Sequence, residues 1–136
     1  QERSATYRAS AHDRKFYDML SYIHQTVKPE NIYLVPPMDG RFNEFRILSG
    51  APIFINWKSH PYKDTEILEW HDRVQRSEAF YALNYSQACQ PLADLANEYK
   101  ITHVVFQKKV AQLDCDFVEE VYRSDIYSIY EITTQP

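Results

Sequence analysis

The segment Ile32-Tyr33-Leu34-Val35 is a short apolar run that lies between polar residues 28–31 and the prolines Pro36-Pro37. A run of this length between turn-forming residues is typical of a buried strand. Two similar runs follow it along the chain, Ile53-Phe54-Ile55-Asn56 and His103-Val104-Val105-Phe106. We therefore expect three short buried strands, one in each run.

Helical patterns separate these runs. The first lies before the first strand, with Asp13 expected as its N-cap and Pro29 as its stop. A short helix is expected to end at Gly50, a long one to begin at Asp64, and another to have Pro91 in its first turn. Strands joined through helices pair in parallel, because such a connection crosses back over the sheet.

The end of the chain has a different pattern. Residues Phe117–Tyr122 and Ile126–Ile132 are rich in β-branched and aromatic side chains, and Arg123-Ser124-Asp125 lies between them, which predicts a hairpin. The expected fold is α/β, a Rossmann-like three-layer sandwich with three parallel strands plus a C-terminal antiparallel hairpin. Residues 1–12 are expected to be a lead-in linker, and 13–136 a single domain. The expected core residues are Leu20, Ile23, Leu34, Ile53, Ile55, Leu68, Leu95, Val104 and Phe106.

Composition excludes several classes of function. The chain has 136 residues and a formal net charge of -4, which argues against nucleic acid as a partner. It contains only two glycines, and neither Gly40 nor Gly50 lies in a phosphate-binding motif, so we expect no nucleotide cofactor and no other cofactor. The five histidines show no metal-ligand spacing, and we expect no metal site.

Cys89 and Cys115 are the two cysteines. They are too few for a zinc site or a disulfide framework. Two free cysteines buried as small apolar side chains are the expected state, and a single bridge between them stays open.

The candidate binding site follows from the expected sheet, since ligands bind outside the carboxyl ends of parallel strands. Three segments reach that rim, 36–39 after the first strand, 56–60 after the second and 107–109 after the third. The candidate ligand-binding residues are Asp39, Arg46, Trp57, Lys58, Tyr62, Glu69, Trp70 and Arg73.

Two interpretations of these residues stay open. In the first, the cations Arg46, Lys58 and Arg73 hold an anionic or sugar-phosphate ligand, the aromatic residues stack on it and the acids accept its hydrogen bonds. In the second, the cations form ion pairs with nearby acids and the tryptophans close the edge of the core. For Arg46 we expect the structural role, a bond to Asp39 or Glu69.

The sequence predicts no catalytic residue. His71 and Asp72 are neighbours on the expected long helix, so their side chains point in different directions and cannot form a dyad. No serine lies in a nucleophile-elbow motif. His71 is expected on the core-facing side of its helix or at its margin.

Several motifs together resemble a known group of proteins. These are Gln25–Pro29, Val35-Pro36-Pro37, the stretch from Phe45 to Gly50, the stretch from Ile55 to Tyr62, Glu69–Arg73 and the terminal Tyr127–Ile132. The chain resembles the soluble C-terminal extracytoplasmic domain of polytopic bacterial membrane proteins whose membrane portion is similar to C-type glycosyltransferases, which use lipid-linked sugars. The resemblance implies that any catalytic acid lies in that membrane portion.

Three hypotheses follow. The first is a non-catalytic accessory domain on the extracytoplasmic side, anchored by an upstream transmembrane portion and helping to bind or position a sugar or anionic substrate. The chain starts with Gln-Glu-Arg-Ser and has no apolar run long enough to span a membrane, so we expect a fragment that follows a last transmembrane helix. The second is a free-standing α/β enzyme or binding domain for an anionic, phosphorylated or sugar ligand. The third is a protein-interaction module that pairs through its edge hairpin. The hairpin tyrosines Tyr122, Tyr127 and Tyr130 form a docking surface in one interpretation, and in the other, which we favour, they cover the helices and keep their hydroxyls in water.

Overall fold

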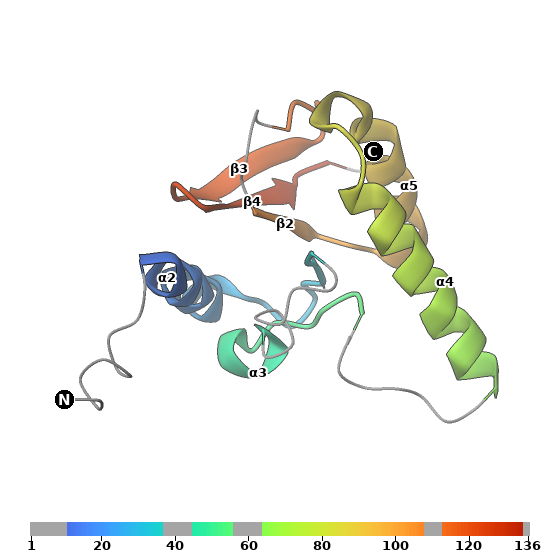
Figure 1. The fold of residues 1–136 in the computed structure, drawn as a ribbon, viewed down its shortest axis with the longest axis horizontal. Helices are drawn as coiled ribbons and strands as arrows, with labels where there is room; N and C mark the ends of the chain where they lie inside the picture. Colours follow the sequence, from blue (N-terminus) through green and yellow to red (C-terminus); the bar gives the residue numbers. More distant parts are fainter. Residues whose placement is uncertain (1–10, 37–44, 56–63, 108–112, 135–136) are drawn as a thin grey trace.

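The protein contains one four-stranded sheet with helices on both sides (Figure 1). The structure is a computed structural model that describes residues 11–36, 45–55, 64–107 and 113–134. Its helices and strands, in chain order, are α2 (Ala11–Thr26), β1 (Tyr33–Leu34), α3 (Phe45–Ser49), α4 (Asp64–Tyr81), the 3₁₀ helix η2 (Tyr85–Gln87), α5 (Cys89–Tyr99), β2 (His103–Gln107), β3 (Val118–Arg123) and β4 (Tyr127–Ile132).

The sheet is mixed, with the strand order β1-β2-β4-β3. β1 pairs with β2 in parallel, and Tyr33 lies opposite His103. β4 pairs antiparallel with β2 on one side and with β3 on the other. The last strand of the chain therefore lies between β2 and β3 rather than at an edge.

The predicted Rossmann-like sandwich with three parallel strands is wrong, because this sheet is mostly antiparallel and has one parallel strand pair. The run from Ile53 is reduced to an isolated parallel bridge with Tyr33. The backbone amide of Tyr33 donates to the carbonyl of Pro52 at 2.8 Å, and the Tyr33 carbonyl accepts from the amide of Phe54 at 2.9 Å. Phe54 and Ile55 are nevertheless buried. Apolar periodicity reports burial, which a strand and an irregular core segment share, so it could not distinguish them.

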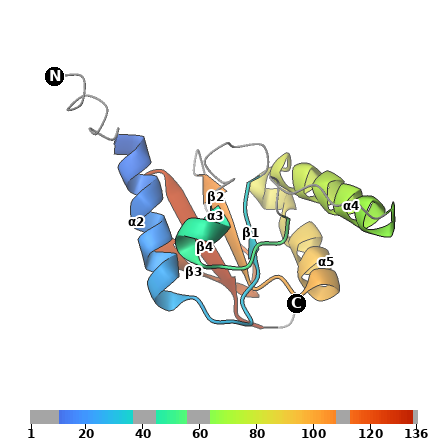
Figure 2. The same ribbon diagram turned by 90° about the horizontal axis from the view of Figure 1, so that it is seen from below.

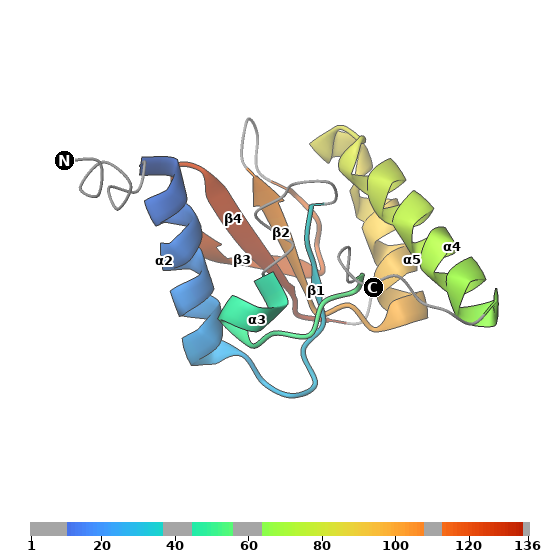
Figure 3. The same cartoon turned by 60° about the horizontal axis from the view of Figure 1, so that its bottom comes forward.

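Alternating side chains of the strands fill two separate cores. Figures 2 and 3 show α2 and α3 on one side of the sheet and α4 and α5 on the other. Tyr33 and Val105 face α2 and α3, whereas Leu34, Val104 and Phe106 face the other layer, as expected when successive strand residues point to opposite faces. β2 is thus buried on both faces.

Most of the predicted core is confirmed. Seven of the nine residues are buried, namely Leu20, Ile23, Leu34, Ile55, Leu95, Val104 and Phe106. Ile53 is partly buried at the isolated bridge. The prediction that Leu68 is a core residue is wrong, since 72% of its surface is exposed. The inward stripe of α4 runs instead through Trp70, Val74, Ser77 and Tyr81, and Leu68 lies beside that stripe; His71, predicted near the core, is also exposed.

The three long helices form where the sequence predicts them. α2 packs Phe16, Met19 and Ile23 into the sheet, but it begins at Ala11, so Asp13 lies inside the helix rather than at its cap. α5 buries Leu92 and Leu95 and ends at Tyr99, and its C-cap Lys100 has a left-handed φ of 62°. This conformation closes the helix through the bond from the Lys100 amide to the Ala96 carbonyl.

The predicted hairpin is confirmed as β3 and β4. Its turn is closed by Ser124, whose amide donates to the Tyr127 carbonyl at 2.8 Å and whose hydroxyl accepts from the Tyr127 amide at 3.0 Å. Tyr127 and Tyr130 are buried in the two cores, because β4 is an interior strand. The interpretation of the hairpin tyrosines as an exposed docking surface is therefore wrong for these two, and Tyr122 is half-buried beside Tyr22.

Cys89 and Cys115 form a disulfide, so the expectation of two free cysteines is wrong. Their Cα atoms lie 5.6 Å apart, and 26 positions separate them in the sequence. The bridge ties the first residue of α5 to the segment that precedes β3. It joins the helical layer to the hairpin side of the sheet.

We expect the disulfide to contribute about 3 kcal/mol to the free energy of unfolding, because it closes a loop of this length in the unfolded chain. Dithiothreitol should lower the melting temperature of the parent by about 10 °C. The double variant Cys89→Ser, Cys115→Ser should melt at that lower temperature with or without the reductant. A parent whose melting is unchanged by verified reduction would contradict this contribution.

His103 begins β2 and is buried, with 8% of its surface exposed. Its ring stacks on that of Tyr33, with the centroids 4.5 Å apart and the planes at 11°. Burial lowers the pKa of His103 from its ordinary value of 6.5 to about 4. The folded protein therefore holds a neutral imidazole there across the physiological range.

This burial predicts an acid-sensitive fold. Between pH 6.5 and 4 the unfolded chain takes up a proton at this histidine and the folded chain does not, so stability falls as the pH falls, by about 3 kcal/mol over the window. Urea unfolding at a series of pH values measures this slope. The slope should be smaller in His103→Gln than in the parent, and it should be retained in the control His71→Gln, which changes an exposed histidine of α4.

Candidate functional site

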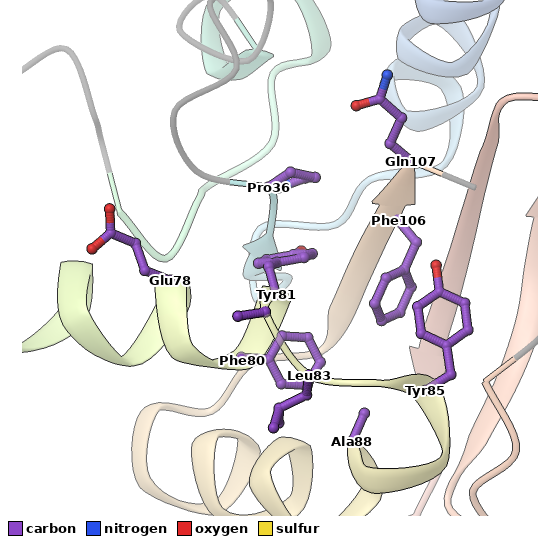
Figure 4. A pocket seen from close by; sticks show the side chains of 10 residues that line it. Pro36, Glu78, Phe80, Tyr81, Leu83, Tyr85, Ala88, Phe106 and Gln107 are labelled. Atoms are coloured by element: carbon purple, nitrogen blue, oxygen red, sulfur yellow. The ribbon is translucent and has the colours of Figure 1, made fainter. Parts of the chain in front are cut away.

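A pocket of about 490 Å³ opens at the carboxyl ends of the parallel strands β1 and β2. Pro36 follows β1 and Gln107 ends β2, and both line it (Figure 4). The opposite wall comes from the last turn of α4, the residues after it and η2. This is the end of a parallel strand pair at which α/β proteins bind their ligands.

Aromatic rings form most of the wall. Phe106 lies at the centre, with the ring centroid of Tyr85 at 4.9 Å, that of Tyr81 at 5.7 Å and that of Phe80 at 5.9 Å. Phe80 and Phe106 are buried, whereas Tyr81 and Tyr85 are partly exposed. Because the rings pack on one another, the wall is stiff before any ligand arrives.

Tyr81 fastens this wall to the sheet. Its hydroxyl lies 3.0 Å from the Leu34 carbonyl and 2.7 Å from the Val105 carbonyl, which places it between β1 and β2. Desolvation by burial raises its pKa well above the ordinary value, so the hydroxyl stays protonated and remains a donor. The end of α4 is thereby held against both parallel strands.

Three polar side chains complete the pocket. Glu78 carries an exposed carboxylate on α4, Gln107 an amide at the end of β2, and Tyr85 a hydroxyl that points upward in Figure 4. Burial also raises the pKa of Tyr85, so this hydroxyl is neutral and can both donate and accept. Glu78 is the one charged residue among the described lining residues. The described lining therefore includes one negatively charged hydrogen-bond acceptor, the Glu78 carboxylate, and no cation.

Three of the eight predicted rim residues have described side chains. Asp39, Trp57, Lys58 and Tyr62 lie outside the described residues, as does the side chain of Arg46. Their predicted roles stay predictions.

Glu69, Trp70 and Arg73 lie on the first half of α4 and do not line the aromatic pocket. Trp70 packs against the core on the α4 and α5 side. Arg73 donates to the Phe54 carbonyl and to Glu69, each at 2.8 Å, and its guanidinium lies 5.0 Å from the ring centres of Phe54 and Tyr99. Arg73 therefore links α4 to Phe54 and Tyr99, which is a structural role. Its predicted role in ligand binding stays untested.

The aromatic pocket lies at the end of the strands where the sequence analysis expected the rim, but its wall was not predicted. Pro36 and Gln107 belong to two of the three segments that were expected at the rim. Phe80, Tyr81 and Tyr85 were not singled out, although three aromatic residues within so short a stretch are a visible signal. Their convergence depends on how α4 and η2 lie against β2, which periodicity does not report.

Among the residues that the structure describes, no group of three or more His, Cys, Asp or Glu side chains is placed to hold a metal ion. Within the same ranges, no helix is long and apolar enough to cross a membrane.

The chain is similar over residues 14–77 to a family described as a domain of unknown function (DUF6798). The match runs from α2 into α4 and stops before the residues of the pocket wall on α4, η2 and β2. No curated protein and no solved structure matches the chain.

We expect Tyr81→Phe to lower the free energy of unfolding by about 1–2 kcal/mol, because it removes the buried donor between the Leu34 and Val105 carbonyls. Tyr85→Phe is the matched control, since the Tyr85 hydroxyl has no hydrogen-bond partner among the described residues. Its stability should remain within about 0.5 kcal/mol of the parent. Equal losses in urea unfolding of the two variants would contradict the anchoring role of Tyr81.

Proposed function

We propose that this chain is a non-catalytic accessory domain on the extracytoplasmic side of a polytopic membrane protein, and that its aromatic pocket binds a sugar for the membrane portion to use. The pocket at the carboxyl ends of β1 and β2 is the observation that carries the proposal. The resemblance of the sequence to such domains supplies the membrane context.

The pocket wall suits a neutral sugar ring. A pyranose has one apolar face of C–H groups and a rim of hydroxyls, so it needs an aromatic surface together with a few donors and acceptors. Tyr85 provides a partly exposed ring on one side of the pocket, the Gln107 amide lies at the end of β2, and the Glu78 carboxylate lies at the opposite edge (Figure 4). A volume of about 490 Å³ is within the range of small-molecule sites.

Charge favours a neutral ligand over the anionic alternative. A phosphorylated ligand would bring its negative charge into a pocket whose one described charged lining residue is the acid Glu78, without a described cation to compensate it. Arg73, one of the three cations predicted to hold an anion, is already bonded to Glu69 and the Phe54 carbonyl. Both observations favour a neutral sugar over a phosphorylated ligand.

The disulfide supports the extracytoplasmic side. Such bonds persist in oxidising compartments and are rare in the reducing cytosol. The bond also supports the site, because Cys89 is adjacent to Ala88 and follows η2, which contributes Tyr85 to the pocket wall. The same disulfide that indicates an oxidising compartment therefore also holds the chain beside the proposed binding surface.

A titration of the purified chain with neutral monosaccharides tests the proposal. Using ¹H–¹⁵N NMR, we expect saturable shifts at Leu83, Tyr85 and Gln107 with glucose, galactose, mannose or N-acetylglucosamine, and a millimolar dissociation constant for at least one of them. Tyr85→Ala should weaken binding by at least tenfold. Tyr17→Ala is the matched control, because it removes a tyrosine that is 54% exposed on α2, on the other side of the sheet.

Glucose 6-phosphate separates the two ligand classes. It should bind more weakly than glucose to the parent, and Glu78→Lys should reverse that order by replacing the acid with a cation. The absence of saturable shifts with every neutral sugar, or tighter binding of the phosphate by the parent, would overturn the proposed ligand.

A further inference from the structure

A second pocket, of about 230 Å³, lies at the opposite end of the parallel strand pair. It is bounded by the last turns of α2, by the loop between α2 and β1, and by β2, β3 and β4. We propose that this polar pocket binds a small zwitterion, a molecule with one ammonium and one carboxylate group such as a free amino acid. The residues that carry the inference are Tyr22, Lys28, Glu30, Asn31, His103 and Glu131.

His103 provides a buried hydrogen-bond donor. The Ile32 carbonyl already accepts from the backbone amides of Thr102 and His103, at 3.0 and 3.2 Å. The Thr102 hydroxyl accepts from the Ile32 amide at 2.9 Å, and it lies 3.2 Å from the Ile32 carbonyl and 2.8 Å from Nδ1 of His103. We assign its proton to Nδ1, which is the nearer acceptor, because the Ile32 carbonyl already accepts from two amides. The neutral ring then carries its proton on Nε2, an assignment that rests on this network of partners.

The Nε2 edge of the ring faces a carboxylate without bonding to it. Nε2 lies 3.8 Å from Oε2 of Glu131, which is too long for a hydrogen bond. Stacking on Tyr33 holds the ring, so this donor does not turn away to find a partner. A ligand atom placed beside both groups can accept from Nε2 or donate to Glu131.

The loop on the other wall carries charges of both signs. Its turn is closed by the Lys28 amide, which donates to Oδ1 of Asn31 at 2.8 Å, and by the Asn31 amide, which donates to the Lys28 carbonyl at 3.0 Å. This turn places Lys28 and Glu30 at the pocket. Within the described ranges, neither of these two side chains forms an ion pair.

The ligand class follows from these groups. A simple anion would meet the carboxylates of Glu30 and Glu131, and a simple cation would leave Lys28 and Nε2 of His103 without an acceptor. A zwitterion pairs its carboxylate with the donors and its ammonium with the acids. The volume equals that of about eight water molecules, which suits a molecule of roughly five to ten non-hydrogen atoms.

NMR titration of the ¹⁵N-labelled chain with glycine and L-serine, up to 50 mM, tests the inference. We expect saturable shifts at the amides of Lys28, Asn31, His103 and Glu131 with either amino acid. Propionate, which has the carboxylate alone, and ethanolamine, which has the amine alone, should bind at least tenfold more weakly. The sugar titration reports on the aromatic pocket at the other end of the strands, so the two proposals fail independently.

Matched variants locate the site. Glu131→Gln and Lys28→Ala should each weaken amino-acid binding by at least tenfold. Glu98→Gln and Lys100→Ala make the same charge changes on α5 and its C-cap, outside this pocket, and should leave the binding unchanged. No saturable shift with either amino acid, equal binding of propionate or ethanolamine, or unchanged binding in both Glu131→Gln and Lys28→Ala would overturn the inference.

Discussion

The burial of β2 on both faces is the constraint on which the rest of the structure depends. Val105 points into the core under α2 and α3, while Val104 and Phe106 point into the core under α4 and α5. The strand also hydrogen-bonds to β1 on one edge and to β4 on the other. A strand enclosed in this way cannot shift its register by one residue without exchanging the side chains of the two cores.

Both proposed sites lie at the ends of this strand, and their chemistry differs. At its carboxyl end Phe106 and Gln107 meet the aromatic residues at the end of α4 and in η2. At its amino end His103 meets the charged loop after α2 and Glu131 of β4. The first wall is apolar with a few polar groups, and the second is polar with charges of both signs. One rigid strand therefore positions two surfaces that suit different ligands.

Cross-links between layers keep the aromatic pocket in place. The Tyr81 hydroxyl holds the end of α4 to two strands, and the Cys89–Cys115 disulfide holds the start of α5 to the hairpin segment. Arg73 adds a third link, from α4 to the carbonyl of Phe54. Each link joins residues far apart in the chain, so the pocket wall belongs to the tertiary structure rather than to one local segment. Preorganisation of this kind lowers the entropy that binding must overcome.

The sequence by itself determined the local elements. The apolar stripes of α2 and α5, the buried run that became β2 and the β-branched hairpin are each encoded within one stretch, because periodicity reports which side chains avoid water. Only the tertiary structure decided that β4 enters between β2 and β3, that Ile53 makes a single bridge, and that the two cysteines meet. The pockets belong to the same group, since Tyr85 and Phe106, or Lys28 and Glu131, become neighbours only when strands and helices pair. Backbone pairing across long separations leaves no local pattern, because any partner that buries the same face satisfies the same periodicity.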